Sequence, residues 1–225
     1  MKVGSLHPWP VTPAEAARIQ RKLVGRLVRV PPPGLRVARV AGADVSFARE
    51  KQMVYAAVVA LSYPSLAVLE VRTASLPATF PYVPGLLAFR EGPALAEAFG
   101  ALEAEPDVVL FDGHGIAHPR GLGIAAHFGL LLNRPTIGVA KSLLTGRCAA
   151  PAPERGATSP LINDGDVVGA AVRTRTGVRP VYVSPGHLMD VATAVRLVLA
   201  FCTRYRLPEP VRLAHHAANL ARKSR

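Results

Sequence analysis

The chain has 225 residues, half of them apolar, and its 27 basic residues outnumber 15 acidic residues to give a formal net charge of +12. No apolar run approaches the roughly 20 residues that a membrane helix needs, and the opening stretch MKVGSLHPWP lacks the long apolar segment of a signal peptide. Two cysteines, Cys148 and Cys202, are too few for a disulfide framework, so we expect reduced thiols in a cytoplasmic protein. The length suits one core, which predicts a single domain over residues 1–225.

The excess of positive charge, which comes mostly from arginine, favours a polyanionic partner. A guanidinium group pairs with phosphate through a planar fork of donors, and a basic face attracts nucleic acid before other polyanions. A basic solvated surface that reflects only genome composition would carry the same net charge. Charge therefore predicts a nucleic-acid partner but does not separate an enzyme from a passive binder.

The first part of the chain is typical of a helix followed by three strands. Residues 12–28 combine a Thr cap, a Pro at the first helical position and apolar residues at helical spacing, which predicts a helix. The apolar and β-branched runs at 35–48, 52–62 and 66–74 then predict strands. The short turn YPS between the last two indicates an antiparallel meander.

The rest of the chain alternates helices with short strands. We expect helices over 86–102, 121–133, 187–205 and 209–223, and strands over 106–115, 135–142, 165–174 and 179–184. The stretch 148–160, rich in Pro, Ala and Gly, is typical of a surface loop. Three consecutive strands followed by alternating helices and strands indicate an α/β fold with a mixed sheet flanked by helices. Ligands of such sheets gather at the carboxyl ends of central strands.

Three carboxylates differ from the other acids in their context. Asp44 interrupts an apolar strand, Asp112 ends the run VVLFD, and Glu91 lies early in the helix predicted after a proline segment. A single Asp at a strand end can simply cap a turn or a helix. Two such acids with a third from a neighbouring helix would repel one another unless a cation neutralised them, and Mg²⁺ prefers oxygen ligands. The pattern favours a metal centre that cuts or transfers phosphodiesters.

The segment FPYVPGLLAFRE at 80–91 sets a tyrosine, Tyr82, between two prolines. Pro81 and Pro84 restrict the backbone, so such a loop loses little conformational entropy on binding. Tyr82 can stack into the space that a base leaves, as side-chain wedges do when they unstack DNA. A tyrosine half buried beside a loop is the plainer alternative, and the residues alone favour it.

Four segments together resemble the endonuclease V family: VAGADVSF, FPYVPGLLAFRE, VVLFDGHGIAHPRGLGIAAHFGLLLNRPTIGVAKSLLTG and LPEPVRLAH. The likeness runs in order from about residue 12 to 217. It implies a ribonuclease H-like fold and Mg²⁺-dependent hydrolysis, with Mn²⁺ able to replace Mg²⁺. It also implies recognition of deoxyinosine, the product of adenine deamination, in double- or single-stranded DNA. Family members cut the second phosphodiester bond 3′ to the lesion and leave 3′-hydroxyl and 5′-phosphate ends.

The resemblance also implies roles for individual residues. The catalytic set is Asp44, Glu91, Asp112, Lys141 and His215. Within it, Asp44, Asp112 and Glu91 hold the metal, and Lys141 stabilises charge on the phosphate. The wedge is formed by Pro81, Tyr82, Val83 and Pro84. The pocket for a flipped base is formed by Gly85, Leu86, Leu87, Gly113, Gly115, Ser142 and Leu144. His118 is assigned to the substrate phosphate or to the water around the metal.

Three other histidines, His216, His114 and His127, have less defined or purely structural expectations. His216 is the neighbour of His215, and a slip of one residue would exchange the two. His114 stands where other family members often have Asn or Gln, so a polar contact to the substrate is the mild expectation. His127 lies on an apolar helix and is expected to pack in the core.

Two further interpretations stay open. A structure-selective nuclease, or a ribonuclease that cuts inosine-containing RNA, would keep the fold and the metal, and the sequence does not locate the contact to a 2′-hydroxyl that would decide. A non-catalytic binder of lesions or branched nucleic acid is the alternative from another class. The clustered acids and Lys141 count against it, because a pure binder gains nothing from carboxylates near a phosphate. In every case we expect a monomer without a membrane partner.

Overall fold

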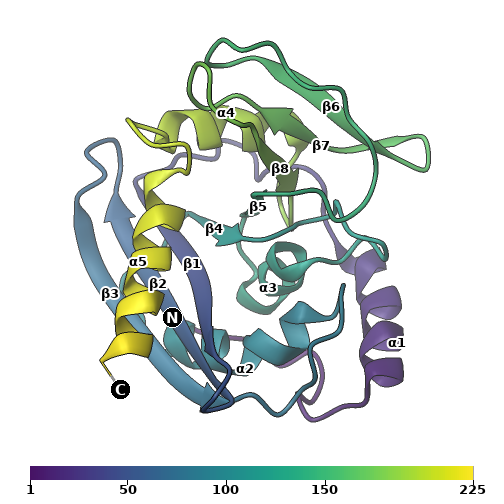
Figure 1. Cartoon of the computed structure of the whole chain (residues 1–225), viewed down its shortest axis with the longest axis vertical. Coiled ribbons are helices and arrows are strands. Elements are labelled where there is room, and N and C mark those ends of the chain that lie inside the picture. Colours follow the sequence, from purple (N-terminus) through teal and green to yellow (C-terminus); the bar gives the residue numbers. More distant parts are fainter. Residues whose placement is uncertain (225) are drawn as a thin grey trace.

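The computed structural model describes residues 1–224 and, within them, one mixed sheet of 8 strands. The strands are β1 (Arg39–Ala48), β2 (Met53–Ser62), β3 (Val68–Pro77), β4 (Val108–Asp112), β5 (Thr136–Ala140), β6 (Thr158–Asn163), β7 (Asp166–Val172) and β8 (Val181–Pro185). Their order is β3-β2-β1-β4-β5-β8-β7-β6 (Figure 1). β1, β4 and β5 are parallel, and the other neighbours are antiparallel. The predicted α/β fold with a ribonuclease H-like mixed sheet is confirmed.

Helices cover both faces of this sheet. Those in the described part of the chain are α1 (Pro13–Leu23), α2 (Leu87–Gly100), α3 (Ile124–Leu132), α4 (Val191–Phe201) and α5 (Glu209–Lys223). α1 begins as predicted, because the Thr12 hydroxyl accepts a hydrogen bond from the Glu15 N–H at 3.3 Å and the Glu15 carboxylate accepts one from the Thr12 N–H at 2.8 Å. It ends earlier than expected and continues as a 3-10 turn over Val24–Arg26, which includes a glycine.

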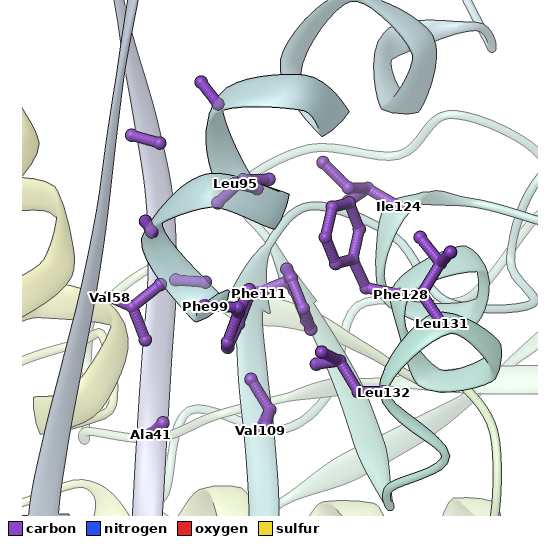
Figure 2. Packing of buried hydrophobic residues seen from close by; sticks show 14 of the residues in the cluster. Ala41, Val58, Leu95, Phe99, Val109, Phe111, Ile124, Phe128, Leu131 and Leu132 are labelled. Carbon is purple, nitrogen blue, oxygen red and sulfur yellow. The ribbon is translucent and has the colours of Figure 1, made fainter. Parts of the chain in front are cut away.

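Each face of the sheet carries its own apolar core. α2 and α3 cover one face, where Phe99, Phe111 and Phe128 lie within one cluster of aromatic rings (Figure 2). α4 and α5 cover the other face, and Phe201 and Val211 belong to its buried cluster. β4 and β5 are therefore covered on both sides, as expected for short apolar strands at the centre of a sheet.

α5 lies close against β1 because Gly42 has no side chain. A Cβ atom at this position would stand 1.9 Å from the carbonyl oxygen of Pro210, the second residue of α5. The helix then follows β1 and β2 along their length (Figure 1). This close approach allows side chains further along α5 to reach polar residues of β1.

Two expectations for the second half of the chain need correction. The stretch 148–160 is not entirely a loop, because β6 starts at Thr158 and pairs with β7. Pro160 within β6 is tolerated because this strand lies at the edge of the sheet, where one missing N–H group costs little. The helix expected over 187–205 is shorter, since it starts after Asp190, whose side chain caps it by accepting a hydrogen bond from Thr193 N–H at 2.6 Å.

No helix within residues 1–224 combines the length and the apolar composition of a membrane span.

Candidate active site

Parallel pairing of β1, β4 and β5 brings three charged residues to one end of the sheet. β1 and β4 pair as far as Ala43 and Phe111, so Asp44 and Asp112 are the next residues on adjacent strands. Lys141 directly follows the last residue of β5. Its ammonium group forms an ion pair with the carboxylate of Asp112. Asp112 and Lys141 therefore lie at the carboxyl ends of β4 and β5, and Asp44 lies beside them where β1 continues past its pairing with β4.

The carboxylate of Asp44 is paired with a histidine from α5. The Asp44 side chain is only 10% exposed, and its Oδ2 lies 2.6 Å from Nδ1 of His215. Nδ2 of Asn219 donates to Nε2 of His215 at 3.1 Å, while the hydroxyl of Ser46 donates to Oδ1 of Asn219 at 3.0 Å. Because Nε2 of the imidazole accepts, Nδ1 carries the hydrogen that is donated to Asp44. Both histidines are exposed, but the helix register turns His215, and not His216, toward Asp44.

The carboxyl groups of the site oppose one another's ionisation. Burial, followed by the charge of Asp112, raises the pKa of Asp44 to about 6. Burial, followed by the charges of Asp44 and Asp112, raises the pKa of Glu91 to about 8 even though Arg90 acts in the opposite direction. A bound cation reverses this effect, because it stabilises the ionised form of every carboxyl group around it.

The donor set of the site fits a divalent metal ion. Asp44, Asp112 and His215 each offer one ligand atom, and these atoms lie within 4.8 Å of one another. Carboxylate oxygens are the donors that Mg²⁺ and Mn²⁺ prefer, and imidazole nitrogen binds many transition metals. Glu91, which the resemblance implies as a ligand, lies outside this tight group, although both aspartates are close enough to raise its pKa.

The backbone of Lys141 is held by a hydrogen bond from Arg206, while its side chain stays partly exposed. Nη2 of Arg206 donates to the carbonyl oxygen of Lys141 at 3.2 Å and to that of Pro180 at 2.7 Å. The Lys141 side chain is 42% exposed, against 13% for its partner Asp112. The arrangement therefore presents a cation at the edge of an acidic centre, where an incoming phosphate can reach it.

A cavity of about 260 Å³ opens where the loop after β4 meets the loop before α2. Its walls include five residues of the predicted base pocket: Gly85, Leu87, Gly113, Ser142 and Leu144. The other two lie elsewhere. Leu86 is buried in a cluster with Phe80 and Phe89, and Gly115 packs against the backbone of Pro185.

The predicted wedge forms one rim of this cavity. Tyr82, Val83 and Pro84 are among its lining residues. The Tyr82 side chain is 71% exposed, so the ring projects from the loop instead of packing beside it. Pro81 is exposed as well. The half-buried tyrosine considered as the plainer alternative is therefore not what the structure contains.

His118 has both ring nitrogens engaged within the protein. Nδ1 accepts a hydrogen bond from the Arg120 N–H at 3.1 Å, so Nε2 carries the hydrogen and donates to the carbonyl oxygen of Gly85 at 2.8 Å. Burial lowers its pKa to about 4, which keeps the ring neutral. Its contact to a substrate phosphate stays a prediction, and it would require one of these hydrogen bonds to open.

Two further residues line the cavity but received no defined role from the sequence. Gln20 is a buried polar residue of α1. In the sequence alone it cannot be told from a glutamine on the solvent-facing side of an amphipathic helix. His114 has an Nδ1 atom that is buried without a hydrogen-bond partner within residues 1–224, and burial lowers its pKa to about 4. In the sequence, His114 is marked by its place in GHG, directly after the strand that ends at Asp112, and by the polar contact to the substrate that the resemblance led us to expect.

Comparisons with known proteins agree along nearly the whole chain. A family profile described as endonuclease V matches residues 21–216. An endonuclease V of Myxococcus xanthus is 52% identical over 216 residues, which cover 96% of this chain and 92% of the relative. The crystal structure of an endonuclease V from Streptomyces avermitilis is 42% identical, with a TM-score of 0.91 over 100% of this chain and 99% of that one.

Some of the similar structures contain nucleic acid. An endonuclease V from Ciona intestinalis is 30% identical to this chain, with a TM-score of 0.83 over 94% of this chain and 98% of its own. It was solved in complex with a 23mer DNA containing an inosine followed by a ribo-adenosine.

Proposed function

This chain belongs to the endonuclease V family of nucleases, and we propose that it is a Mg²⁺-dependent repair enzyme that cuts DNA at deoxyinosine. It hydrolyses the second phosphodiester bond 3′ to the lesion and leaves 3′-hydroxyl and 5′-phosphate ends. The observation that carries the proposal is the cluster of Asp44, Asp112 and His215 in the same chain as an exposed Tyr82 and a cavity of about 260 Å³.

The acidic cluster supplies the catalytic centre. Asp44 and Asp112 would hold the metal ion, with His215 and Glu91 beside them, and Mg²⁺ there supplies Lewis-acid activation of water and stabilisation of the leaving oxygen. Mn²⁺ prefers the same oxygen donors and should replace it. The cation would favour the ionised form of Glu91, whose carboxylate could then accept a proton from the attacking water. The ammonium group of Lys141 stabilises negative charge that develops on the phosphate.

The wedge and the cavity supply lesion recognition. Tyr82 stacks into the gap that the deaminated base leaves, and the flipped base enters the cavity. At about 260 Å³ the cavity is small for a ligand pocket, which suits one planar base and excludes bulky adducts. Gly85 and Gly113 line its wall, where backbone groups can approach the Watson–Crick edge of the base closely.

Inosine-containing RNA is the second candidate substrate. The Ciona intestinalis relative binds a DNA strand in which a ribo-adenosine follows the inosine, so a 2′-hydroxyl next to the lesion is compatible with this family's site. The metal centre and the wedge would serve either strand type. A preference for RNA would need a hydrogen bond to the 2′-hydroxyl group.

Asparagine in place of Asp44 or Asp112 tests the assignment of the catalytic centre. Each variant keeps the side-chain volume but removes a negative ligand, so cutting of a deoxyinosine duplex in Mg²⁺ should fall by roughly 10³-fold or more. Binding of the same duplex, measured by gel shift in EDTA, should persist. A wild-type protein that binds this duplex but never cuts it with Mg²⁺ or Mn²⁺ would favour the non-catalytic binder.

A further inference from the structure

Three hydrogen-bond donors from other parts of the chain converge on one carbonyl oxygen at the base of the loop that carries Tyr82. The carbonyl oxygen of Gly85 accepts from Nε2 of Gln20 at 2.9 Å, from Nε2 of His118 at 2.8 Å and from Nη2 of Arg120 at 2.8 Å. Gln20 lies on α1, whereas the other two donors come from the loop after β4. The loop that carries Tyr82 is therefore tied to two separate parts of the fold through a single backbone atom.

Gln20 connects the members of this cluster. Its Nε2 also donates to the carbonyl oxygen of Leu122 at 3.0 Å, and its Oε1 accepts from Nε of Arg120 at 2.6 Å. Both amide hydrogens and the amide oxygen are thus in use, and the reversed amide would place its oxygen against two carbonyl oxygens. The side chain is only 1% exposed, so water cannot replace these contacts.

The base of the loop has little freedom, whereas its tip is exposed. Gly85 has a φ of +77°, and a Cβ atom there would stand 2.7 Å from Nη2 of Arg120, so the cluster requires glycine at this position. Apolar packing adds to the attachment, because Leu86 and Phe80 form a buried cluster with Ala16 of α1. Tyr82 at the tip is 71% exposed, so its position depends on how the base of the loop is held.

We propose that Gln20 is a positioning residue, which holds the Tyr82 loop in the conformation needed to open a duplex by fixing the Gly85 carbonyl. A loop that is already fixed loses little entropy when it enters DNA, and a loosened loop would have to be ordered during binding. The effect is specific to substrates whose stacking must be broken. This inference rests on the proposed function, since it assigns Tyr82 to lesion opening.

Substitutions at Gln20 separate positioning from a purely structural role. Gln20→Met removes all three hydrogen bonds, whereas Gln20→Glu keeps an acceptor for Arg120 and removes both donors. Gln52→Met is the matched control, because Gln52 is exposed and its side chain donates to the Arg49 carbonyl oxygen of the same turn at 2.7 Å. For each variant, kcat/KM is measured on a deoxyinosine duplex and on the deoxyinosine strand alone, and the ratio of the two is compared.

The ratio does not depend on the folded fraction, because misfolded protein lowers both rates equally. We expect the duplex-to-single-strand ratio to fall by about tenfold or more in both Gln20 variants and to stay unchanged in Gln52→Met. An unchanged ratio in both Gln20 variants would overturn the inference and leave Gln20 with a structural role.

Hydrogen exchange without nucleic acid keeps this inference separate from the proposed function. The amide of Leu86 donates to the Val83 carbonyl oxygen at 2.9 Å, so amides of the segment 80–87 report on loop order. We expect faster exchange in this segment for Gln20→Met and wild-type exchange for Gln52→Met. If the wild-type protein cut no substrate, the proposed function would fail, while equal exchange in wild type and Gln20→Met would refute the inference by itself.

Discussion

Ser46, Asn219 and His215 form a chain of hydrogen bonds that ends on Asp44. The Asn219 amide has one orientation, because its Nδ2 also donates to the carbonyl oxygen of His215 at 2.9 Å. This amide therefore donates to Nε2 of His215, and Nδ1 of the imidazole carries the hydrogen that faces the carboxylate. The same principle applies at Gly85, where donors on other elements fix the carbonyl oxygen. At the scale of single residues, hydrogen bonds from side chains on distant parts of the chain orient groups of the site at both places.

Tyr82 offers the simplest test at this scale. Tyr82→Ala should weaken binding to a deoxyinosine duplex by roughly 1–3 kcal/mol, the value of stacking one base on an aromatic ring. Tyr82→Phe keeps the ring and should bind like the wild type, because stacking on a base depends on the aromatic ring and not on the hydroxyl group. Dissociation constants from fluorescence anisotropy give the answer. Equal affinity for all three proteins would contradict a wedge role.

The packing of α5 against β1 is the contact between secondary-structure elements that matters most for the geometry of the site. Gly42 allows the start of α5 to touch the strand, and the same helix then presents His215 to Asp44. The helix was predicted with its observed bounds, 209–223, from its amphipathic pattern. The close approach of α5 to β1 was not predicted, because a glycine in a strand does not show which other segment of the backbone packs against it.

Gly42→Ala should therefore disturb stability and activity together. The added Cβ atom meets backbone, which cannot rotate away, so α5 must shift and we expect a loss of roughly 1–3 kcal/mol or more in the free energy of unfolding. Gly100→Ala is the control, since a Cβ atom there meets nothing within 4 Å, and it should be neutral or slightly stabilising. Urea denaturation and the cutting assay provide both readouts. A wild-type result for Gly42→Ala would refute the proposed packing constraint.

At the scale of the whole molecule, the chain before α1 is tied across the face that α2 and α3 cover. Gly4 N–H donates to the carbonyl oxygen of Leu131 at 2.7 Å, and Nε2 of His7 lies 2.7 Å from Nε2 of His127. His127 is fully buried among aromatic rings, as expected for a packed residue. Burial, followed by the charge of His7, lowers the pKa of His127 to about 3.

Because His127 is buried in its neutral form, we expect the free energy of unfolding to fall in acid. The unfolded chain binds a proton at this residue below pH 6.5, whereas the native state resists protonation down to about pH 3. The unfolded state therefore binds more protons, so stability falls as the pH drops from 6.5, by up to about 1.4 kcal/mol per pH unit. His127→Gln should show a smaller difference between urea unfolding at pH 7.5 and at pH 5.0. An equal difference in both proteins would contradict this assignment.

Much of the fold follows from local patterns. An acid that interrupts one apolar strand and an acid that ends another were enough to predict that Asp44 and Asp112 lie near each other, and the parallel pairing of β1 with β4 brings them to adjacent positions. The strand β6 was missed because Pro160 and its neighbours resemble a loop, and only the edge position in the sheet makes a proline acceptable there.

The parts of the site that sequence could not give depend on contacts between distant segments. Gln20 lies 65 residues from Gly85 in the chain, and nothing in an amphipathic helix distinguishes a buried glutamine from a solvated one. The choice between His215 and His216 depends on the rotation of α5 about its axis. The resemblance placed Leu86 in the base pocket, yet its side chain is buried in the core.

The most direct test of the central claim is to map the cut itself. A labelled duplex with one deoxyinosine is incubated with the wild-type protein and Mg²⁺, next to an undamaged duplex, an inosine RNA and a sample with EDTA. We expect a single metal-dependent cut at the second phosphodiester bond 3′ to the lesion, with no cut in the undamaged duplex. Cutting at other positions, equal cutting of the undamaged duplex, or no cutting of any substrate with Mg²⁺ or Mn²⁺ would contradict the claim.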